Sequence, residues 1–345
     1  MLMLLEVLRS AFVFLAISTG LACPIVERLG LTPAERVVAL PALSLLGVFL
    51  FAWAIYVFAL PAAVFGLLPL LAAAGLLSGW RTLVGTWRDA AARSLVVSQL
   101  LVTGWCIAWM TTIASYSGGG WAGDWFEHWE RTRFFLERWP LDRKFLLDYS
   151  LTARPPLVNV VVGAFLQLTR ADFAHFQMGM TLFSSLAFLP AGLFALHWGG
   201  RRSIAVLALL FLVNPLFVEN ATFAWTKLPA GFFVLAALYF FLRSRGVGVP
   251  SGASLLGSAL LGAGLLTHYS AGPYAVMLAA AWLGTAWARR RDLAWWRTTA
   301  GICLVGGLVL AVWFGWAVAH YGFAGTFFTN TSVTVPEAHG GVEPM

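Results

Sequence analysis

Residues 37–58 read VVALPALSLLGVFLFAWAIYVF and contain no charged side chain. A helix needs about 20 consecutive apolar residues to cross the hydrocarbon core of a bilayer, so this stretch alone is long enough for one span. Similar apolar runs lie near 5–26, 60–78, 95–114, 173–197, 203–219, 228–242, 254–267, 271–287 and 299–319. Together with the first stretch they predict an all-α, polytopic transmembrane helical bundle of about ten spans.

The composition of the 345-residue chain agrees with this prediction. Hydrophobic residues make up 60% and charged residues only 11%, whereas a soluble domain carries roughly 25% charged residues. In water, such a chain would expose large apolar patches. The 17 tryptophans and 27 phenylalanines suit the aromatic belts of a membrane protein. We therefore predict an integral, multi-pass membrane protein and exclude a soluble domain.

The net charge of +7 does not indicate a nucleic-acid partner. The basic residues stand between apolar runs in ones to threes, so they form no stripe that a phosphate backbone could follow.

The three cysteines, Cys23, Cys106 and Cys303, lie in or beside apolar segments and have neither disulfide nor metal-site spacing.

The short loops predict which side of the membrane each one faces, because cytoplasmic loops are enriched in lysine and arginine. Thirteen of the 22 basic residues but only four of the 15 acidic ones lie in the loops near 27–36, 79–94, 198–203, 243–253 and 288–298. We expect these loops in the cytoplasm. Both termini and the long loop 115–172 are then extracytoplasmic.

The long loop holds the most informative polar residues. Six of the 15 acidic residues lie within 124–148, after the glycine run 118–120, which permits a sharp turn at the membrane exit. Later in the loop, Arg154-Pro155-Pro156 precedes an apolar stretch at 156–169 that is too short for a span. We expect this stretch to form an interfacial helix that lies along the outer leaflet.

Residues 123–131, GDWFEHWER, predict an amphipathic juxtamembrane helix in the same loop. Helical spacing places Asp124, Glu127, His128 and Arg131 on one face and Trp125, Trp129 and Leu136 on another. We expect the tryptophans to rest among the lipid headgroups, because their rings suit that depth. The acidic side chains would then stand above the membrane surface.

Asp124 has two interpretations. Because Glu127 follows it by three residues, Asp124 is typical of a helix cap with its reciprocal partner. As a carboxylate at the membrane surface it is also a candidate general base. His128 is either an ordinary interfacial histidine or, together with Asp124 and Glu127, a weak candidate ligand of a divalent metal.

The other extracytoplasmic turns are polar as well. Beside Arg154 in the long loop, the candidate residues there are Glu219, Asn220 and Lys227 in one turn and His268 and Tyr269 in another. Each has a plain explanation in loop polarity or in a lysine that extends to the interface. Taken together, they predict a polar face with cations that suit a lipid-linked phosphate at the leaflet surface.

These residues resemble the motifs of the GT-C superfamily of membrane glycosyltransferases. The resemblance is narrower to the family 39-like group, which is related to protein O-mannosyltransferases and to the aminoarabinose transferases of lipid A. It rests on an acidic motif at 123–127, the Arg154-Pro155-Pro156-Leu157 start of a juxtamembrane helix, Asn214-Pro215 leading into Trp225-Thr226-Lys227, and the turn at 266–271. It covers about 95–320, and the acidic motif is its most specific part.

The resemblance implies an inverting transfer of a sugar from a polyprenyl phosphate to an acceptor on the outer face of a membrane, here the cytoplasmic (inner) membrane of a bacterium. The acid of the first outer loop, carried onto Asp124, would activate an acceptor hydroxyl or amine, with Glu127 as a second candidate catalytic acid. Arg154, Lys227, His268, Tyr269, Glu219 and Asn220 would bind donor phosphate or substrate. The acceptor would be a glycan, a lipid or a protein, and no cofactor is implied beyond a candidate divalent metal.

The same resemblance divides the chain. Three spans in residues 1–94 precede the helix that leads into the acidic loop, whereas the family usually has one span in all. Residues 1–94 would therefore be an N-terminal three-span extension. Residues 95–320 would be a GT-C-like catalytic module, and residues 321–345 a polar extracytoplasmic tail.

Two hypotheses from other classes stay open. A lipid-sugar or polysaccharide transporter or flippase would carry ionisable groups near the middle of its spans, and the predicted spans lack them there. A non-catalytic subunit of an envelope-glycan assembly would need an obligate partner to be active.

Overall fold

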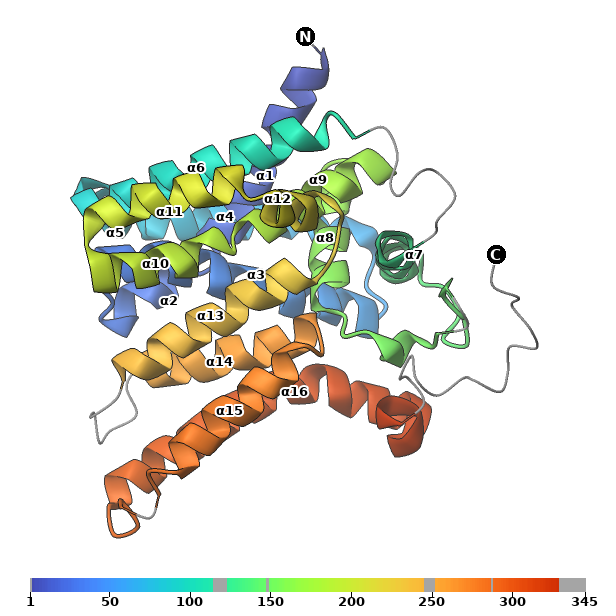
Figure 1. Ribbon diagram of the computed structural model, residues 1–345. Coiled ribbons are helices and arrows are strands. Elements are labelled where there is room, and N and C mark those ends of the chain that lie inside the picture. The colour runs from blue at the N-terminus through green and yellow to red at the C-terminus, as the bar shows by residue number, and fades with distance from the viewer. Residues whose placement is uncertain (1, 114–122, 147–148, 245–251, 287, 329–345) are drawn as a thin grey trace, which may run out of the picture.

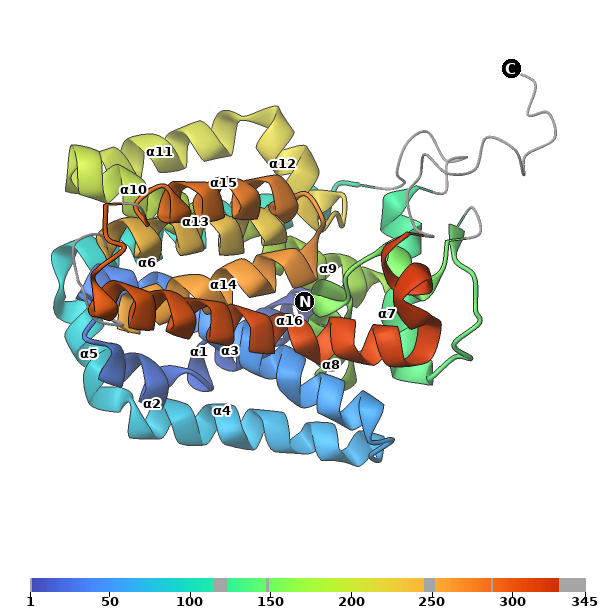
Figure 2. The same cartoon turned by 90° about the horizontal axis from the view of Figure 1, so that it is seen from below.

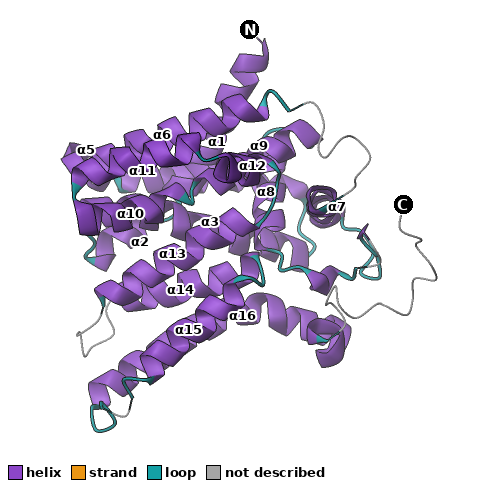
Figure 3. Cartoon of the chain, viewed as in Figure 1, coloured by secondary structure: helices purple, strands orange, loops and turns teal. Residues whose placement is uncertain are grey.

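The computed structural model describes residues 2–113, 123–146, 149–244, 252–286 and 288–328, and every element named in those ranges is a helix (Figure 3). The first half of the chain forms α1 (Leu2–Gly20), α2 (Cys23–Val26), α3 (Pro33–Val57), α4 (Leu67–Ser78), α5 (Trp80–Arg88), α6 (Ala90–Met110), α7 (Asp124–Glu137) and α8 (Leu157–Leu168). The second half forms α9 (Phe173–Ser185), α10 (Phe188–Gly199), α11 (Arg201–Val213), α12 (Pro215–Thr222), α13 (Lys227–Arg243), α14 (Gly252–Thr267), α15 (Ala271–Leu283) and α16 (Leu293–Phe327). Short 3₁₀ turns, η1 (Glu27–Leu29), η2 (Ala62–Gly66) and η5 (Leu151–Ala153), join some of them.

The helical class agrees with the sequence prediction, and several helices are apolar and long enough to cross a membrane. In the described residues, five helical segments pass that test, and the number rises to seven if each of two bent helix pairs counts as one span. Three further apolar helices, α8, α14 and α15, are shorter than a typical span. The chain is thus a helical protein with the character of a multi-pass membrane protein, and the prediction of ten spans is met only in part.

The long helices lie side by side, and the two ends of the bundle differ in character (Figure 1). The loops that the charge pattern assigned to one side, including α2, α5, the α10–α11 turn and the α15–α16 connection, lie at the left in Figure 1 and again in Figure 2. The helix α7 lies at the opposite end in both views. We call these ends the arginine end and the α7 end.

The helix α3 runs through the core of the bundle and contacts α1, α6, α8, α10 and α13. It begins at a capping box, in which Thr32 and Glu35 each accept a hydrogen bond from the backbone N–H of the other. Pro33 occupies the first helical position, where no N–H is needed. Because buried residues from α1 to α16 join one cluster around α3, residues 1–94 and 95–320 share a single core.

The stretch that was expected to lie along the leaflet forms α8, but its surroundings differ from the prediction. Every residue from 157 to 166 is buried within the protein, since α8 packs against α3, α7 and α9. In Figure 1 it runs crosswise to the long helices, between their right-hand ends and α7. The prediction that α8 lies along the outer leaflet is therefore wrong. Instead, α8 is enclosed between α7 and the ends of longer helices such as α3 and α9.

Two breaks in the helices follow from their residues. The helices α11 and α12 bend by 71° at Asn214-Pro215, since a residue before proline avoids the helical region and Asn214 is extended there (φ −82°, ψ 106°). The long helix α16 changes direction at Gly322, whose φ of 69° favours glycine. The part after Gly322 folds back at the α7 end (Figure 2).

Some sequence expectations lie outside the described residues. They are the glycine run 118–120, Arg245 of one basic loop, and the tail from residue 329 onward. The boundary expected at residue 320 falls inside α16, which continues to Phe327.

Candidate functional site

The helix α7 forms as expected, but it presents its charged face to the protein. Glu127, His128 and Arg131 are 0–3% exposed. The rings of Trp125 and Trp129 pack edge-on against Phe173 at the start of α9, with centroid distances of 5.3 and 5.9 Å. The expectation that acids stand above the membrane surface is therefore wrong for Glu127. Its charge is tolerated because Arg131 of the same helix and Arg154 of a later segment lie beside it.

Asp124 does not cap α7. The capping position is Gly123, which has no side chain to accept a hydrogen bond, and Asp124 is the first helical residue. A carboxylate in this first turn is still favourable, because it faces the positive end of the helix dipole. The side chain of Asp124 is 39% exposed. It is therefore free to meet a second molecule, which a capping carboxylate would not be.

Arg131 ties α7 to the segment that follows it. Its guanidinium donates to Glu127 Oε1 (2.8 Å) one turn earlier, to the carbonyl of Leu151 (2.7 Å) and to the carbonyl of Ser150 (2.9 Å). The same group lies 4.4 Å above the ring of Phe145. With three hydrogen-bonded partners and an aromatic face, this fully buried charge is paired as a buried ion must be.

Arg154 stands at the end of that segment and bridges both acids of α7. Its Nη2 lies 3.5 Å from Asp124 Oδ1 and 3.4 Å from Glu127 Oε2, while its guanidinium lies 5.4 Å from the ring centre of Tyr149. The side chain is 23% exposed. The pair Asp124–Arg154 thus combines a carboxylate and a cation that both reach solvent.

The turn between α14 and α15 comes to the same place. Tyr269 donates its hydroxyl to the carbonyl of Thr152 (2.7 Å), within the segment that Arg131 holds. His268 Nδ1 accepts from the backbone N–H of Ser270 (3.0 Å), which leaves Nε2 of a neutral ring to carry the proton. Burial lowers the pKa of His268 to about 4, helped by the positive charges of Arg154 and Lys227.

Lys227 completes the cluster from the start of α13. Its Nζ lies 4.1 Å from the ring centre of Trp225, and the side chain is exposed. Because its charge acts on His268, the turn before α13 lies near the turn after α14. We call Asp124, Glu127, Arg154, Lys227, His268 and Tyr269 the α7-end cluster.

His128 lies beneath this cluster and stays neutral. Burial lowers its pKa to about 3, and the nearby charges of Arg131 and Arg154 lower it further. Its Nδ1 has no hydrogen-bond partner among the described residues. In that same part of the chain, no three His, Cys, Asp or Glu residues are grouped so that they could hold a metal ion, and Glu127 already faces two guanidinium groups.

Two of the sequence candidates, Glu219 and Asn220, make contacts within their own helix. Glu219 is exposed in the last turn of α12. Asn220 donates its amide to the carbonyl of Leu216 in its own helix (2.8 Å). Within the described ranges, no hydrogen bond or ion pair joins either residue to the α7-end cluster. Direct contacts, by contrast, join Asp124 and Glu127 to Arg154, the charges of Arg154 and Lys227 act on His268, and that of Arg154 acts on Tyr269.

The sequence interpretation missed Arg131 as a site residue, although one signal for it was present. Glu127 and Arg131 are four residues apart, which is the spacing of an ion pair along a helix. The acceptors at Ser150 and Leu151 gave no signal, because any backbone carbonyl can accept and their approach depends on the tertiary fold.

Comparisons with known proteins do not assign the chain to a family. No family model, no curated protein and no solved structure matches the chain. The resemblance to the GT-C superfamily therefore stays a prediction that rests on the residues alone.

Proposed function

We propose that the chain is a GT-C-like glycosyltransferase that moves a sugar from a polyprenyl phosphate to an acceptor at the extracytoplasmic face of a bacterial cytoplasmic membrane. One observation carries the proposal. A partly exposed carboxylate, Asp124, lies beside Arg154, in a cluster that also holds Lys227 and a neutral histidine. The acceptor is a hydroxyl or amine of a glycan, a lipid or a protein.

The proposed mechanism begins with a proton transfer. The exposed carboxylate of Asp124 takes a proton from the acceptor hydroxyl or amine. At the same time, the oxygen or nitrogen of the acceptor attacks the anomeric carbon of the sugar. The bond from that carbon to the lipid phosphate breaks with inversion, and the phosphate leaves with the electron pair. General-base help of this kind contributes about 10²–10⁴-fold to a rate.

The cations of the cluster suit the leaving group. The charge on the phosphate oxygen grows as the glycosidic bond breaks, and cations fixed in advance stabilise such a charge without reorganising. Lys227 and Arg154 are exposed or partly exposed and approach from different segments. The charges of both cations act on His268, whose neutral ring offers a hydrogen bond to the sugar or phosphate. Tyr269 donates its own hydroxyl to Thr152, so it can only accept a hydrogen bond from the sugar.

Glu127 takes a positioning role in this proposal. Its carboxylate has no exposed surface and lies between Arg131 and Arg154. It therefore fixes the guanidinium of Arg154 beside Asp124 without touching substrate. The candidate divalent metal has no part in the mechanism.

The test is the activity of Asp124→Asn on a panel of polyprenyl-phosphate sugars, with products from membranes identified by mass spectrometry. We expect the variant to fold, because an amide still fits beside Arg154, and to lose about 10²–10⁴-fold in rate. Asp142→Asn is the control, because Asp142 is an exposed acid of the same loop that lies outside the cluster. Full activity of Asp124→Asn, or no transfer by the wild type across the panel, would contradict the proposal.

A further inference from the structure

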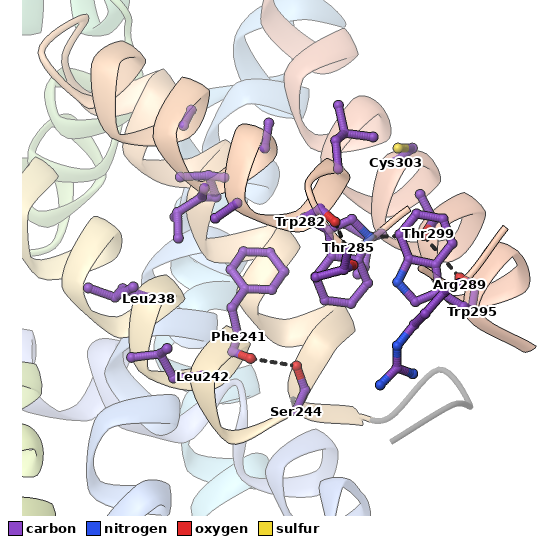
Figure 4. A pocket seen from close by; sticks show the side chains of 17 residues that line it. Leu238, Phe241, Leu242, Ser244, Trp282, Thr285, Arg289, Trp295, Thr299 and Cys303 are labelled. Carbon is purple, nitrogen blue, oxygen red and sulfur yellow. Dashed lines mark hydrogen bonds between the residues drawn. The ribbon is translucent and has the colours of Figure 1, made fainter. Parts of the chain in front are cut away.

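A groove of about 540 Å³ lies between α13, α14, α15 and α16 (Figure 4). This volume is within the range of small-molecule sites, roughly 300–1,000 Å³. Most of its wall is hydrocarbon, from side chains such as Leu238, Phe241, Leu261 and Leu278. The lining comes mainly from α15, together with the last turns of α13 and the first turns of α16, so the groove lies at the arginine end, away from the α7-end cluster.

The groove exists because α15 stands away from the bundle. Along α15 only Ala271, at its start, is buried, and in Figure 1 α15 diverges from α13 and α14. The helix α16 stays against α14, where Ser258 donates its hydroxyl to the carbonyl of Ile302. Side chains along α15 such as Val276 and Met277 are 69% exposed. In a membrane these apolar surfaces face lipid, so an acyl chain can enter the groove from the side.

A wall of tryptophan gives the groove a fixed shape. The rings of Trp282 and Trp295 are stacked, with centroids 6.0 Å apart and an interplanar angle of 16°. Trp282 Nε1 donates to Thr299 Oγ1 (2.9 Å), which joins α15 to α16 (Figure 4). Tryptophan with a satisfied N–H is typical of the membrane–water boundary. This boundary therefore lies at the end of the groove.

One cation lines that end. Arg289 is part of the wall, and its side chain is 39% exposed. Among the described residues it has one ion pair, to Asp292 Oδ2, which is 3.8 Å long, beyond hydrogen-bond distance. The nearby hydroxyls of Ser244 and Thr285 donate to carbonyls of their own helices. In the part of the chain that the structure describes, most N–H donors of Arg289 therefore have no acceptor, and Arg290 and Arg291 follow it in the sequence.

We propose that this groove binds an anionic phospholipid, with one acyl chain along the apolar wall and the headgroup phosphate on Arg289. Basic pockets between membrane helices bind anionic headgroups, and an apolar groove with a cation at its boundary end matches the two parts of such a lipid. The proposal does not depend on the proposed function, because the groove and the α7-end cluster lie at opposite ends of the bundle.

The first experiment measures lipid retention. The full chain, purified in mild detergent, is incubated with phosphatidylglycerol or phosphatidylcholine of identical acyl chains, and bound lipid is counted by native mass spectrometry. We expect the wild type to prefer phosphatidylglycerol by about fivefold, the effect of one surface arginine. Arg289→Ala should lose the preference, whereas Arg201→Ala, an exposed arginine of the same end outside the groove, should keep it.

A second pair of variants tests whether the lipid is bound inside the groove rather than elsewhere on the surface. Ala279→Phe adds a ring inside the groove, and Val276→Phe adds the same ring on the same helix outside it. We expect only Ala279→Phe to reduce the retention of phosphatidylglycerol. Equal retention of the two lipids by the wild type would overturn the proposal. So would equal behaviour of the two arginine variants or of the two phenylalanine variants.

Discussion

Arg131 decides the local structure of the candidate site, because its guanidinium joins α7 to residues 150–151. A charge with 1% exposure is costly unless it is paired. Here Glu127 supplies the opposite charge, and the carbonyls of Ser150 and Leu151 accept the remaining hydrogen bonds. Removing one partner of such a pair strands the other, which costs about 3–5 kcal/mol.

We expect Arg131→Met to lower the free energy of unfolding by about 3–5 kcal/mol, because Glu127 would keep only the longer contact to Arg154 and two carbonyls would lose their donor. Denaturant titration of the purified protein in detergent measures the change. Loss of the purified, folded form would agree with this expectation. A change below about 1 kcal/mol would contradict the role given to Arg131.

Arg133→Met is the matched control. Arg133 pairs with Glu137 at the same four-residue spacing on the same helix, but both side chains are more than 40% exposed. Exposed pairs contribute roughly 0–1 kcal/mol. We therefore expect a loss of less than about 1 kcal/mol, so that the difference between the two variants measures burial rather than helix position.

At the residue scale, the sequence indicated which polar residues belong to the candidate site, but it gave less information on their orientation and contacts. The polarity of separate turns predicted that Asp124, Arg154, Lys227, His268 and Tyr269, with Glu219 and Asn220, belong to one polar face, and in the structure Asp124 contacts Arg154 while Tyr269 bonds to the neighbouring Thr152. Periodicity also identified the two faces of α7. It could not show which face turns inward, because the tryptophan face and the charged face can each be buried if partners exist. Those partners, the carbonyls and Phe145, are distant along the chain or carry no distinctive signal.

At the scale of elements, close backbone contact between α1 and α4 is a strong local constraint. A Cβ added to Gly75 would stand 2.0 Å from the carbonyl oxygen of Gly20, and one added to Gly20 would stand 2.3 Å from that of Ala72. Small residues let membrane helices approach in this way, and van der Waals packing then holds them together. Sequence analysis placed both helices but could not pair them, since glycine is frequent throughout the chain.

We expect Gly75→Ala to destabilise the protein by about 1–3 kcal/mol, because the methyl group forces the two backbones apart. Gly104→Ala is the control, as a Cβ on Gly104 in α6 meets nothing within 4 Å. That variant should be neutral or slightly stabilising, since alanine favours helix by about 1 kcal/mol over glycine. Thermal unfolding in detergent compares the two, and equal effects would contradict the close packing of α1 on α4.

The number of spans shows where element prediction fails. Hydropathy ended the span at residue 78 and assigned 79–94 to a loop, but it did not reveal that this loop holds the helix α5, which is bent by 63° from α4. The break at Asn214-Pro215 did have a sequence signal in the proline. Its angle depends on how α12 then packs against α6 and α9, which local sequence does not encode.

At the scale of the whole molecule, the separation of charge predicts the orientation in the membrane. The arginine end should face the cytoplasm. We expect Arg88→Cys, made in a Cys303→Ser background that leaves only buried cysteines, to resist a membrane-impermeant maleimide on intact cells and to react after permeabilisation. Lys144→Cys, exposed near α7, should react on intact cells. The reverse pattern of labelling would place the α7-end cluster in the cytoplasm and remove the basis of the proposed function.

The enclosed position of α8 has a consequence for biosynthesis. Its neighbours include α3, which leaves the ribosome earlier, and α9 and α14, which leave it later. During synthesis its ten enclosed residues are therefore exposed before α9 and α14 are made. In that interval they would contact lipid or an assembly factor. Arg154 is synthesised just before α8, whereas His268 is synthesised much later. The α7-end cluster would thus assemble only late in translation, and a nascent chain arrested before α14 would be inactive.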